Sequence, residues 1–321
     1  MQLKILLTAY NDWNSLYLVA EKIHDTFKNT EWKDYELLIV NDGSIEKIDK
    51  NKDLKSKYTL INLLNNQGNQ KAISIGLKYC VNVEKDFKYL AILDSDGEDK
   101  PEDIPRLLKA CELNNQTKII FAKRTRRNDG LLFNFFYKIY KFIFRNLTRH
   151  ELDFGNFSCV PENLLKRITA LGTLQTHYSG SVIKAKIPMA KIDCEKGKRL
   201  FGNSTMGLNR KLHHSIMSLS LFIEEIAVKS FFSSLAIMIF IILGSLSVFV
   251  VRVFTDFLVL GWTSNILLSL FIIFVILLLV ALFSLVILII NKNNSPTNFK
   301  ADESLDLIDD VVKKNKVFKL N

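Results

Sequence analysis

Hydrophobic and polar positions divide the chain into two parts with different patterns. In residues 1–205, short apolar runs alternate with amphipathic segments. The runs predict buried strands at Gln2–Thr8, Glu36–Val40, Thr59–Leu64, Tyr89–Leu93 and Lys118–Ala122. The segments between them repeat apolar residues at helical spacing and predict helices over Asn14–Lys28, Asn69–Val81 and Glu102–Leu113. This alternation predicts an α/β fold with a mostly parallel sheet covered by helices.

The second part contains two long apolar segments without a charged residue, Phe231–Val251 and Ile266–Ile290. Each is long enough to cross a hydrocarbon core of roughly 30 Å as a helix that rises about 1.5 Å per residue. The alternative is a pair of buried core helices, but the length and uniform apolarity favour a transmembrane hairpin over residues 231–290.

Basic residues flank this hairpin on its outer sides. Arg210, Lys211 and Lys229 precede the first segment, and Lys292 and Lys300 follow the second. The positive-inside rule therefore predicts a multi-pass protein of the cytoplasmic membrane, with the N-terminal region and the tail over 291–321 in the cytoplasm. Two spans per chain are compatible with a homo-oligomer.

Two further segments have the pattern of helices that lie in a membrane interface. Over residues 130–149, Lys138, Lys141, Arg145 and Arg149 share one helical face, opposite a stripe of aromatic and aliphatic residues. The alternative is an ordinary amphipathic helix packed on the domain. Residues 206–230 predict a second, juxtamembrane amphipathic helix that leads into the first span.

Net charge and cysteine content limit which partners and which redox compartment are compatible with the chain. The net charge of +10 is compatible with nucleic acid or anionic lipid. With two membrane spans in the chain, lipid headgroups and phosphorylated substrates are favoured and nucleic acid is not expected. The four cysteines have no Cys-x-x-Cys spacing, which is typical of thiols that fill the core in a reducing compartment.

Four acidic residues follow the fourth predicted strand. The segment 94–99 is Asp-Ser-Asp-Gly-Glu-Asp, and Pro101 begins the next element. Ligands of open α/β sheets bind at the carboxyl ends of the strands, where this segment lies. Clustered carboxylates provide the oxygen ligands that Mg²⁺ or Mn²⁺ prefers, and such an ion typically bridges the phosphates of a nucleotide. The alternative is a solvated acidic turn before the helix that starts near Glu102.

Three more segments stand at the ends of the earlier strands: Thr8-Ala-Tyr-Asn-Asp12, Val40-Asn-Asp-Gly-Ser44 and Asn65-Asn-Gln-Gly-Asn-Gln-Lys-Ala72. In this order and spacing, together with the acidic segment, they resemble the family 2 inverting glycosyltransferases of the GT-A fold over roughly residues 1–205. With the hairpin included, the chain looks most similar to the branch of dolichol-phosphate mannose synthases and bacterial polyprenyl-phosphate glycosyltransferases.

The resemblance implies a donor site at the strand ends. Thr8, Tyr10 and Asp42 would line the nucleoside pocket next to Asp12, with Tyr10 offering a ring face and Asp42 an acceptor for a ring N–H. Tyr10 as a core residue and Asp42 as a turn residue are the alternatives. Asp94 and Asp96 match the metal-binding Asp-x-Asp motif, with Asp96 in direct contact and Glu98 as a further oxygen ligand.

The resemblance also implies groups that bind phosphate and the acceptor. Arg124 and Arg127 follow the fifth strand and would hold donor or acceptor phosphate through bidentate guanidinium contacts; the alternative is a solvated basic loop near anionic lipid. Lys198 and Arg199 belong to a stretch that resembles the loop closing over the donor phosphates. Asp153 would orient the acceptor or act as a base.

Several positions depart from the family pattern. Asn41 stands where the usual Asp-Asp-Gly-Ser has its first aspartate, Thr205 replaces a common lysine, and Asp12 replaces a more frequent glutamate. The Gln-x-x-Arg-Trp signature of processive synthases is missing, which argues against a polymerising enzyme.

The expected activity is transfer of a sugar, with inversion, from a nucleotide sugar to a membrane lipid acceptor. The favoured acceptor is a polyprenyl phosphate. A uridine nucleotide is weakly favoured over a guanosine nucleotide. A second hypothesis keeps the donor chemistry but uses a saccharide or lipid hydroxyl in cell-envelope glycan assembly, where Asp153 would be the general base. A third is a catalytically silent membrane scaffold.

Overall fold

The computed structural model describes residues 2–46, 54–84, 87–124, 139, 141–142, 144–151, 153–197, 199–201, 216–254, 261–293 and 305–314. The chain divides into two compact units. Unit 1 comprises Met1–Phe142, His150–Leu221 and Phe299–Asn321, and unit 2 comprises Ile143–Arg149 and Phe222–Asn298.

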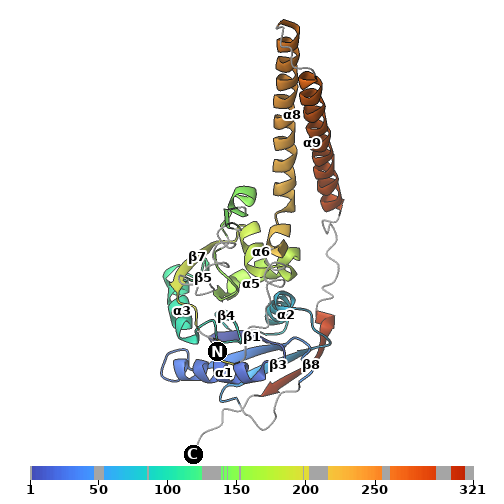
Figure 1. Ribbon diagram of the computed structural model, residues 1–321. Coiled ribbons are helices and arrows are strands. Elements are labelled where there is room, and N and C mark those ends of the chain that lie inside the picture. Colours follow the sequence, from blue (N-terminus) through green and yellow to red (C-terminus); the bar gives the residue numbers. More distant parts are fainter. Residues whose placement is uncertain are drawn as a thin grey trace, which may run out of the picture. The chain divides into compact units, whose positions relative to one another are not determined.

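Unit 1 is built on one mixed sheet with the strand order β7-β5-β6-β4-β1-β2-β3-β8 (Figure 1). The strands are β1 (Leu3–Ala9), β2 (Tyr35–Asn41), β3 (Lys57–Leu63), β4 (Tyr89–Asp94), β5 (Ile119–Arg124), β6 (Ser158–Pro161), β7 (Met189–Cys194) and β8 (Ile308–Lys314). β1 pairs in parallel with β2 and β4, β2 with β3, and β5 with β7. β6 is antiparallel to β4 and β5, and β8 is antiparallel to β3.

Helices cover both faces of this sheet because alternate side chains of the central strands point to opposite sides. Leu3, Ile5 and Leu7 of β1 join one buried cluster with the apolar faces of α1 (Trp13–Phe27) and α3 (Ile104–Leu113). The other face carries α2 (Asn69–Asn82), which contacts α5 (Glu162–Thr169) and α6 (Tyr178–Lys184). Short 3₁₀ turns are η1 (Pro101–Asp103), η2 (Gly172–Gln175) and η3 (Leu305–Leu307).

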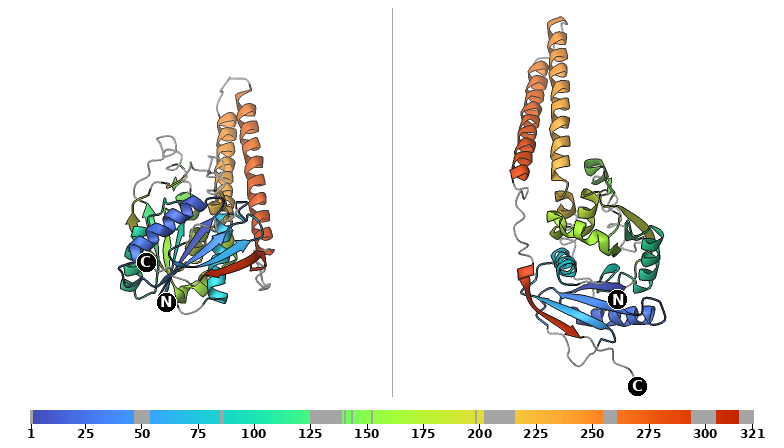
Figure 2. Two further views of the ribbon diagram at one scale, coloured as in Figure 1. Left: turned by 90° about the horizontal axis from the view of Figure 1, so that it is seen from below. Right: turned by 180° about the vertical axis from the view of Figure 1, so that it is seen from behind.

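The predicted α/β fold class is confirmed, and so are the five strands and three helices predicted in the N-terminal part, with ends that differ by about two residues or fewer. The periodicity did not predict β6, β7 or β8. β8 comes from the C-terminal tail and returns to pair with β3, with Leu60 opposite Val312 (Figures 1 and 2). The predicted limits of the domains stay predictions.

Unit 2 contains two long apolar helices, α8 (Ile223–Phe254) and α9 (Trp262–Asn293), which lie side by side in all views (Figures 1 and 2). By length and composition both could cross a membrane, and only 6% and 11% of their most apolar windows are buried in the chain. The alternative of buried core helices is therefore wrong. Ser234, Ser247, Ser269 and Ser284 each donate to a carbonyl three or four residues earlier in the same helix, as hydroxyls do where no water is available.

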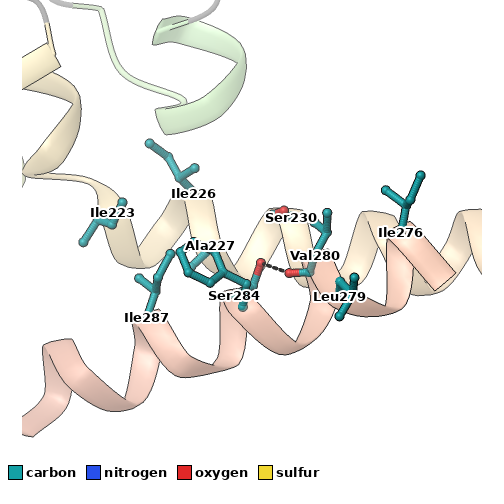
Figure 3. Close-up of a pocket in the computed structure, with 10 residues that line it drawn as sticks. Ile223, Ile226, Ala227, Ser230, Ile276, Leu279, Val280, Ser284 and Ile287 are labelled. Carbon is teal, nitrogen blue, oxygen red and sulfur yellow. Dashed lines mark hydrogen bonds between the residues drawn. The ribbon is translucent and has the colours of Figure 1, made fainter. Parts of the chain in front are cut away.

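A groove of about 520 Å³ runs between the start of α8 and the second half of α9 (Figure 3). Its lining is aliphatic apart from Ser230, Phe283 and Ser284, and the Ser284 hydroxyl donates to the carbonyl of Val280. The groove thus offers an apolar surface inside the hairpin.

The predicted interfacial helix over 130–149 is described only in part. Residues 139, 141–142 and 144–148 are helical, whereas Lys138 lies outside the described residues. Phe144 is buried and packs edge-to-face on Phe222, and the centroids of the two rings are 5.5 Å apart. The Lys229 ammonium donates to the carbonyls of Asn146 and Leu147 at 2.8 and 2.7 Å, which satisfies acceptors at the helix end. The C-terminal part of this helix therefore packs on α8, and its place in the interface stays a prediction.

Candidate active site

The ends of parallel strands bring the first and fourth motifs together. Thr8 and Asp94 are register partners on β1 and β4. The Thr8 hydroxyl donates to Asn69 Oδ1 at 2.6 Å, and Asn69 Nδ2 donates to Asp94 Oδ1 at 3.0 Å. Asn69 is the first residue of α2 and lies within the third motif, but its type and position alone did not predict a role for it. It links the predicted nucleoside side of the site to the predicted metal side.

Asp42 holds a loop rather than pointing freely into solvent. It is buried, and its two carboxylate oxygens accept hydrogen bonds from the backbone N–H groups of Gln67 at 2.7 Å and Gly68 at 2.9 Å. Burial raises the pKa of Asp42, and these two bonds partly oppose that effect. Asp42 thus has the turn role of the alternative interpretation, and its contact with a nucleoside stays a prediction.

The two loops around Asp42 approach each other backbone to backbone at Gly43. This residue has φ +66°, and a Cβ placed on it would lie 2.3 Å from the carbonyl carbon of Asn65. Only glycine allows both the left-handed conformation and the approach. On the other side, the Ser44 hydroxyl accepts from the N–H of Asn11 at 2.9 Å.

Tyr10 directly follows β1 and is 45% exposed. The interpretation of Tyr10 as a core residue is therefore wrong. Its exposed ring is compatible with the predicted stacking on a base.

The acidic segment concentrates negative charge in a partly buried turn. Burial, followed by the charges of Asp99 and Asp96, raises the pKa of Asp94 to about 7. Burial also raises the pKa of Asp96, although its Oδ1 accepts from the N–H of Glu98 at 2.9 Å. A cation between Asp94 and Asp96 would relieve the repulsion between these two carboxylates.

Basic side chains compensate the rest of this charge. Arg124, at the end of β5, contacts Asp99 at 2.7 Å and Glu98 at 3.5 Å. Lys196 also contacts Glu98, at 3.1 Å. The interpretation as a solvated acidic turn does not fit these partly buried ion pairs. Arg124 holds the acidic turn in place, and its contact with a substrate phosphate stays a prediction.

No metal cage is preformed within the part of the chain that the structure describes, where no group of three or more His, Cys, Asp or Glu side chains converges. Asp94 and Asp96 provide two carboxylates, whereas Glu98 is engaged with Arg124 and Lys196. The donor set therefore fits an ion that takes its remaining ligands from a bound substrate, and the metal roles of all three acids stay predictions.

The late loop after β7 packs against the acidic turn through backbone contacts. The N–H of Gly197 donates to the carbonyl of Glu98 at 2.7 Å, and that of Leu200 donates to the carbonyl of Asp96 at 3.0 Å. These bonds place Arg199 between Asp12 at 3.0 Å and Asp96 at 3.7 Å. The structure thus brings Arg199 to the site, as predicted, while Lys198 and Arg127 lie outside the described residues.

Asp153 is buried between two lysines. Its carboxylate contacts Lys191 at 2.5 Å and Lys123 at 3.0 Å. Burial alone would raise its pKa, but the hydrogen bonds and charges of Lys191 and Lys123 outweigh burial and hold the pKa below its ordinary value. Lys191, on β7, was not singled out by the sequence analysis because only strand pairing brings it next to Asp153.

Comparison with known proteins identifies the family of the chain. The Glycosyl transferase family 2 domain matches residues 4–172. The uncharacterized glycosyltransferase YkcC of Bacillus subtilis is 23% identical over 284 residues, covering 84% of this chain and 83% of that protein. An undecaprenyl-phosphate 4-deoxy-4-formamido-L-arabinose transferase of Photorhabdus laumondii is 26% identical over 213 residues, which cover 63% of this chain and less than two thirds (62%) of that relative.

Among solved structures, the mannosyltransferase PcManGT from Pyrobaculum calidifontis, in complex with GDP-Man and Mn²⁺, aligns with a TM-score of 0.46 at 14% identity, over 68% of this chain and 63% of that one. The family domain extends over more than half of the 321 residues and contains the four strand-end motifs. The protein is therefore a glycosyltransferase that belongs to glycosyl transferase family 2.

Proposed function

We propose that this glycosyltransferase moves a sugar from a nucleotide sugar to the phosphate of a polyprenyl phosphate in the membrane. The observation that carries the choice of acceptor is the ion pairing of Asp153 with Lys123 and Lys191. A hydroxyl acceptor needs a base to take its proton, whereas a phosphate is already ionised. A carboxylate whose pKa is held low is a weak base, so Asp153 is poorly suited to a hydroxyl acceptor.

The relatives and the hairpin support the same acceptor. Two curated relatives, from Photorhabdus laumondii and Proteus mirabilis, carry the name of undecaprenyl-phosphate transferases. The long apolar helices α8 and α9 expose most of their surface, as helices in lipid do. An enzyme held in the membrane meets a lipid acceptor without extracting it from the bilayer.

The donor would bind at the strand ends. Tyr10 offers its ring to the base, and the loops held by Asp42 form the nucleoside pocket next to Thr8 and Asp12. Asp94 and Asp96 would hold Mg²⁺ or Mn²⁺, which supplies positive charge to the departing diphosphate. Arg199 lies between Asp12 and Asp96 and would turn to the donor phosphates, assisted by Lys198 and Arg127.

The transfer is then a single displacement with inversion. An acceptor phosphate oxygen forms a bond to the anomeric carbon, while the bond from that carbon to the diphosphate breaks. The leaving group takes the bonding electrons as a nucleoside diphosphate. Arg199 stabilises the developing negative charge because its guanidinium already lies within the acidic site.

The sheet topology supports a two-span membrane anchor. β8 pairs with β3, so residues on both sides of the hairpin belong to one sheet and lie on one side of the membrane. A topology in which α8 and α9 both cross the membrane agrees with this pairing. The basic flanks favour the cytoplasm for that side. A cysteine introduced at position 309 should react with an impermeant maleimide only after cell lysis, against a low background, because the four native cysteines are buried.

The function is tested with purified full-length protein, Mn²⁺ or Mg²⁺, polyprenyl phosphate and a panel of radiolabelled nucleotide sugars. Label in a lipid that mild acid cleaves is the expected result. Label only in acid-stable glycan or glycolipid would favour the hydroxyl acceptor instead. Asp96→Asn should lose at least about a hundredfold in turnover, whereas the control Asp309→Asn should keep it. Full activity of Asp96→Asn would refute the assignment of the site.

A further inference from the structure

The C-terminal strand β8 borders the predicted donor site although it follows the membrane helices in the chain. It forms the edge of the sheet next to β3 (Figure 2). Just before it, the carbonyl of Leu307 accepts from the N–H of Leu64 at 3.0 Å. Leu64 directly follows β3 and begins the loop whose Gln67 and Gly68 hold Asp42. The tail thus contacts the start of the loop that shapes the nucleoside pocket.

A chain of side-chain hydrogen bonds connects β8 to the second motif. The N–H of Ser44 donates to Asn41 Oδ1 at 3.0 Å, Asn41 Nδ2 donates to Asn62 Oδ1 at 2.8 Å, and Asn62 Nδ2 donates to Asp310 Oδ1 at 2.5 Å. A backbone donor at one end and a carboxylate at the other leave only one orientation for both amides. The three hydrogen bonds therefore all run in the direction from Ser44 to Asp310, and each bond polarises the amide that donates the next one.

This relay explains a departure from the family pattern. Asn41 stands where the family usually has aspartate. An aspartate at position 41 would place its carboxylate against Asn62 Oδ1, so two acceptors would face each other. If the Asn62 amide turned over to donate to that aspartate, its Oδ1 would face the carboxylate of Asp310 instead. The amide at position 41 and the carboxylate at position 310 are therefore matched to each other across β3.

A second contact anchors the far end of β8. The Lys313 ammonium donates to Glu84 at 2.7 Å. Glu84 also accepts from the buried Lys4 at 3.0 Å, and Lys4 in turn contacts Glu36 on β2 at 2.7 Å. The strand is thus held both at the donor-site end and at the opposite end of β3.

We propose that β8 is a positioning element of the donor site, and that the relay from Asp310 through Asn62 and Asn41 holds Ser44 in the conformation that binds the nucleoside. This inference rests on the proposed donor site. It assigns Asp310, Asn62 and Asn41 as positioning residues, since none of them needs to touch the substrate. The tail that emerges from the membrane hairpin then sets the affinity for the donor.

The test measures binding of UDP and GDP to the full chain by calorimetry, together with steady-state kinetics. Asp310→Ala should weaken binding of the preferred nucleotide about three- to tenfold, because it removes the terminal acceptor of the relay. The KM for the donor should rise by the same factor, with kcat unchanged. The matched control is Asp309→Ala, because Asp309 falls at the irregularity in the β3–β8 register and has no partner on β3.

Reversal of the relay gives the decisive comparison. Asn41→Asp alone should weaken binding as Asp310→Ala does. Adding Asp310→Asn should restore it to within about twofold, because the amide introduced on β8 then donates to Asn62, and Asn62 donates to the carboxylate introduced on β2. Hydrogen exchange of residues 57–63 should stay slow in the single variants, which shows that β8 remains docked.

Each outcome has a defined meaning. Wild-type protein that binds neither nucleotide would refute the proposed function and not the relay. If the wild type binds but Asp310→Ala binds equally well, or if Asp309→Ala loses as much, the positioning role is overturned. Failure of Asp310→Asn to rescue Asn41→Asp would also overturn it.

Discussion

Replacing Gly43 by alanine tests whether backbone contact between two loops shapes the donor site. A Cβ at this position would lie 2.3 Å from the carbonyl carbon of Asn65 and 2.5 Å from the N of Asn66. Both are backbone atoms, which cannot rotate away as a side chain does. The loop must therefore move by about 1 Å to reach an ordinary contact distance. That movement separates Asp42 from its donors on Gln67 and Gly68.

The cost has two components. An alanine at φ +66° is disfavoured by about 1–2 kcal/mol, and forcing a methyl group into a filled contact costs about 1–3 kcal/mol. Gly43→Ala should therefore lower the free energy of unfolding by about 2–5 kcal/mol. Gly155→Ala is the matched control, because no atom lies within 4 Å of its Cβ position and its φ is outside the left-handed region. Its effect should stay within about 0.5 kcal/mol.

Urea unfolding of the full chain, followed by tryptophan fluorescence, measures this difference. Trp13 is a suitable reporter because it is buried and its Nε1 donates to the carbonyl of Glu46 at 2.8 Å, close to the substituted loop. A double-mutant cycle isolates the mechanism. If the loop has already moved, Asp42→Asn costs less in the Gly43→Ala background than in the wild type. Strictly additive effects, or a Gly43→Ala cost no larger than that of Gly155→Ala, would refute the reasoning.

Three further predictions follow from buried charges and caps. Asp153→Asn should destabilise the protein by about 1–3 kcal/mol near neutral pH. Because the folded pKa of Asp153 lies below its ordinary value of 3.8, this stabilisation exists above that value and disappears as the pH falls through the folded pKa. Thermal unfolding at pH 7 and in acid measures it, and a gap that widens in acid would contradict the assignment. Lys4→Met leaves Glu36 and Glu84 without their buried cation and should lower the free energy of unfolding by about 3–5 kcal/mol; a loss below about 1 kcal/mol in urea unfolding would contradict it. Lys229→Met removes the donor to Asn146 and Leu147, so hydrogen exchange should accelerate at residues 144–149 while unit 1 stays unchanged, and equal exchange would show that the cap is unimportant.

Local patterns in the sequence were sufficient for the central elements. β1, β2, β4 and β5 have apolar runs because both faces of these strands are buried. Such a strand is recognised in the sequence as a nearly continuous hydrophobic run. The motifs at their ends were found for the same reason: polar residues begin where a buried strand stops. The two long helices were equally visible, because both are apolar on every side and little of either is buried in the chain.

The partners of the site residues could not be found in this way. Asp153 meets Lys191 only because β6, which follows Asp153, and β7, which carries Lys191, both pair with β5. Arg199 reaches Asp12 only because the late loop packs on the acidic turn. These contacts show that Asp153 is an ion-paired carboxylate and that Asp42 holds a loop. The predicted roles of both residues toward the substrates stay predictions.

The sequence by itself thus determined the α/β class, the positions of the strands near the site, the family and the two apolar helices, because each depends on neighbours along the chain. Only the tertiary structure decided that the tail completes the sheet as β8 and that Asp310 lies next to Asn62, 248 residues away. The physical reason is that strand pairing uses backbone hydrogen bonds, which every residue except proline can form, so the pairing partner leaves no mark on the local sequence.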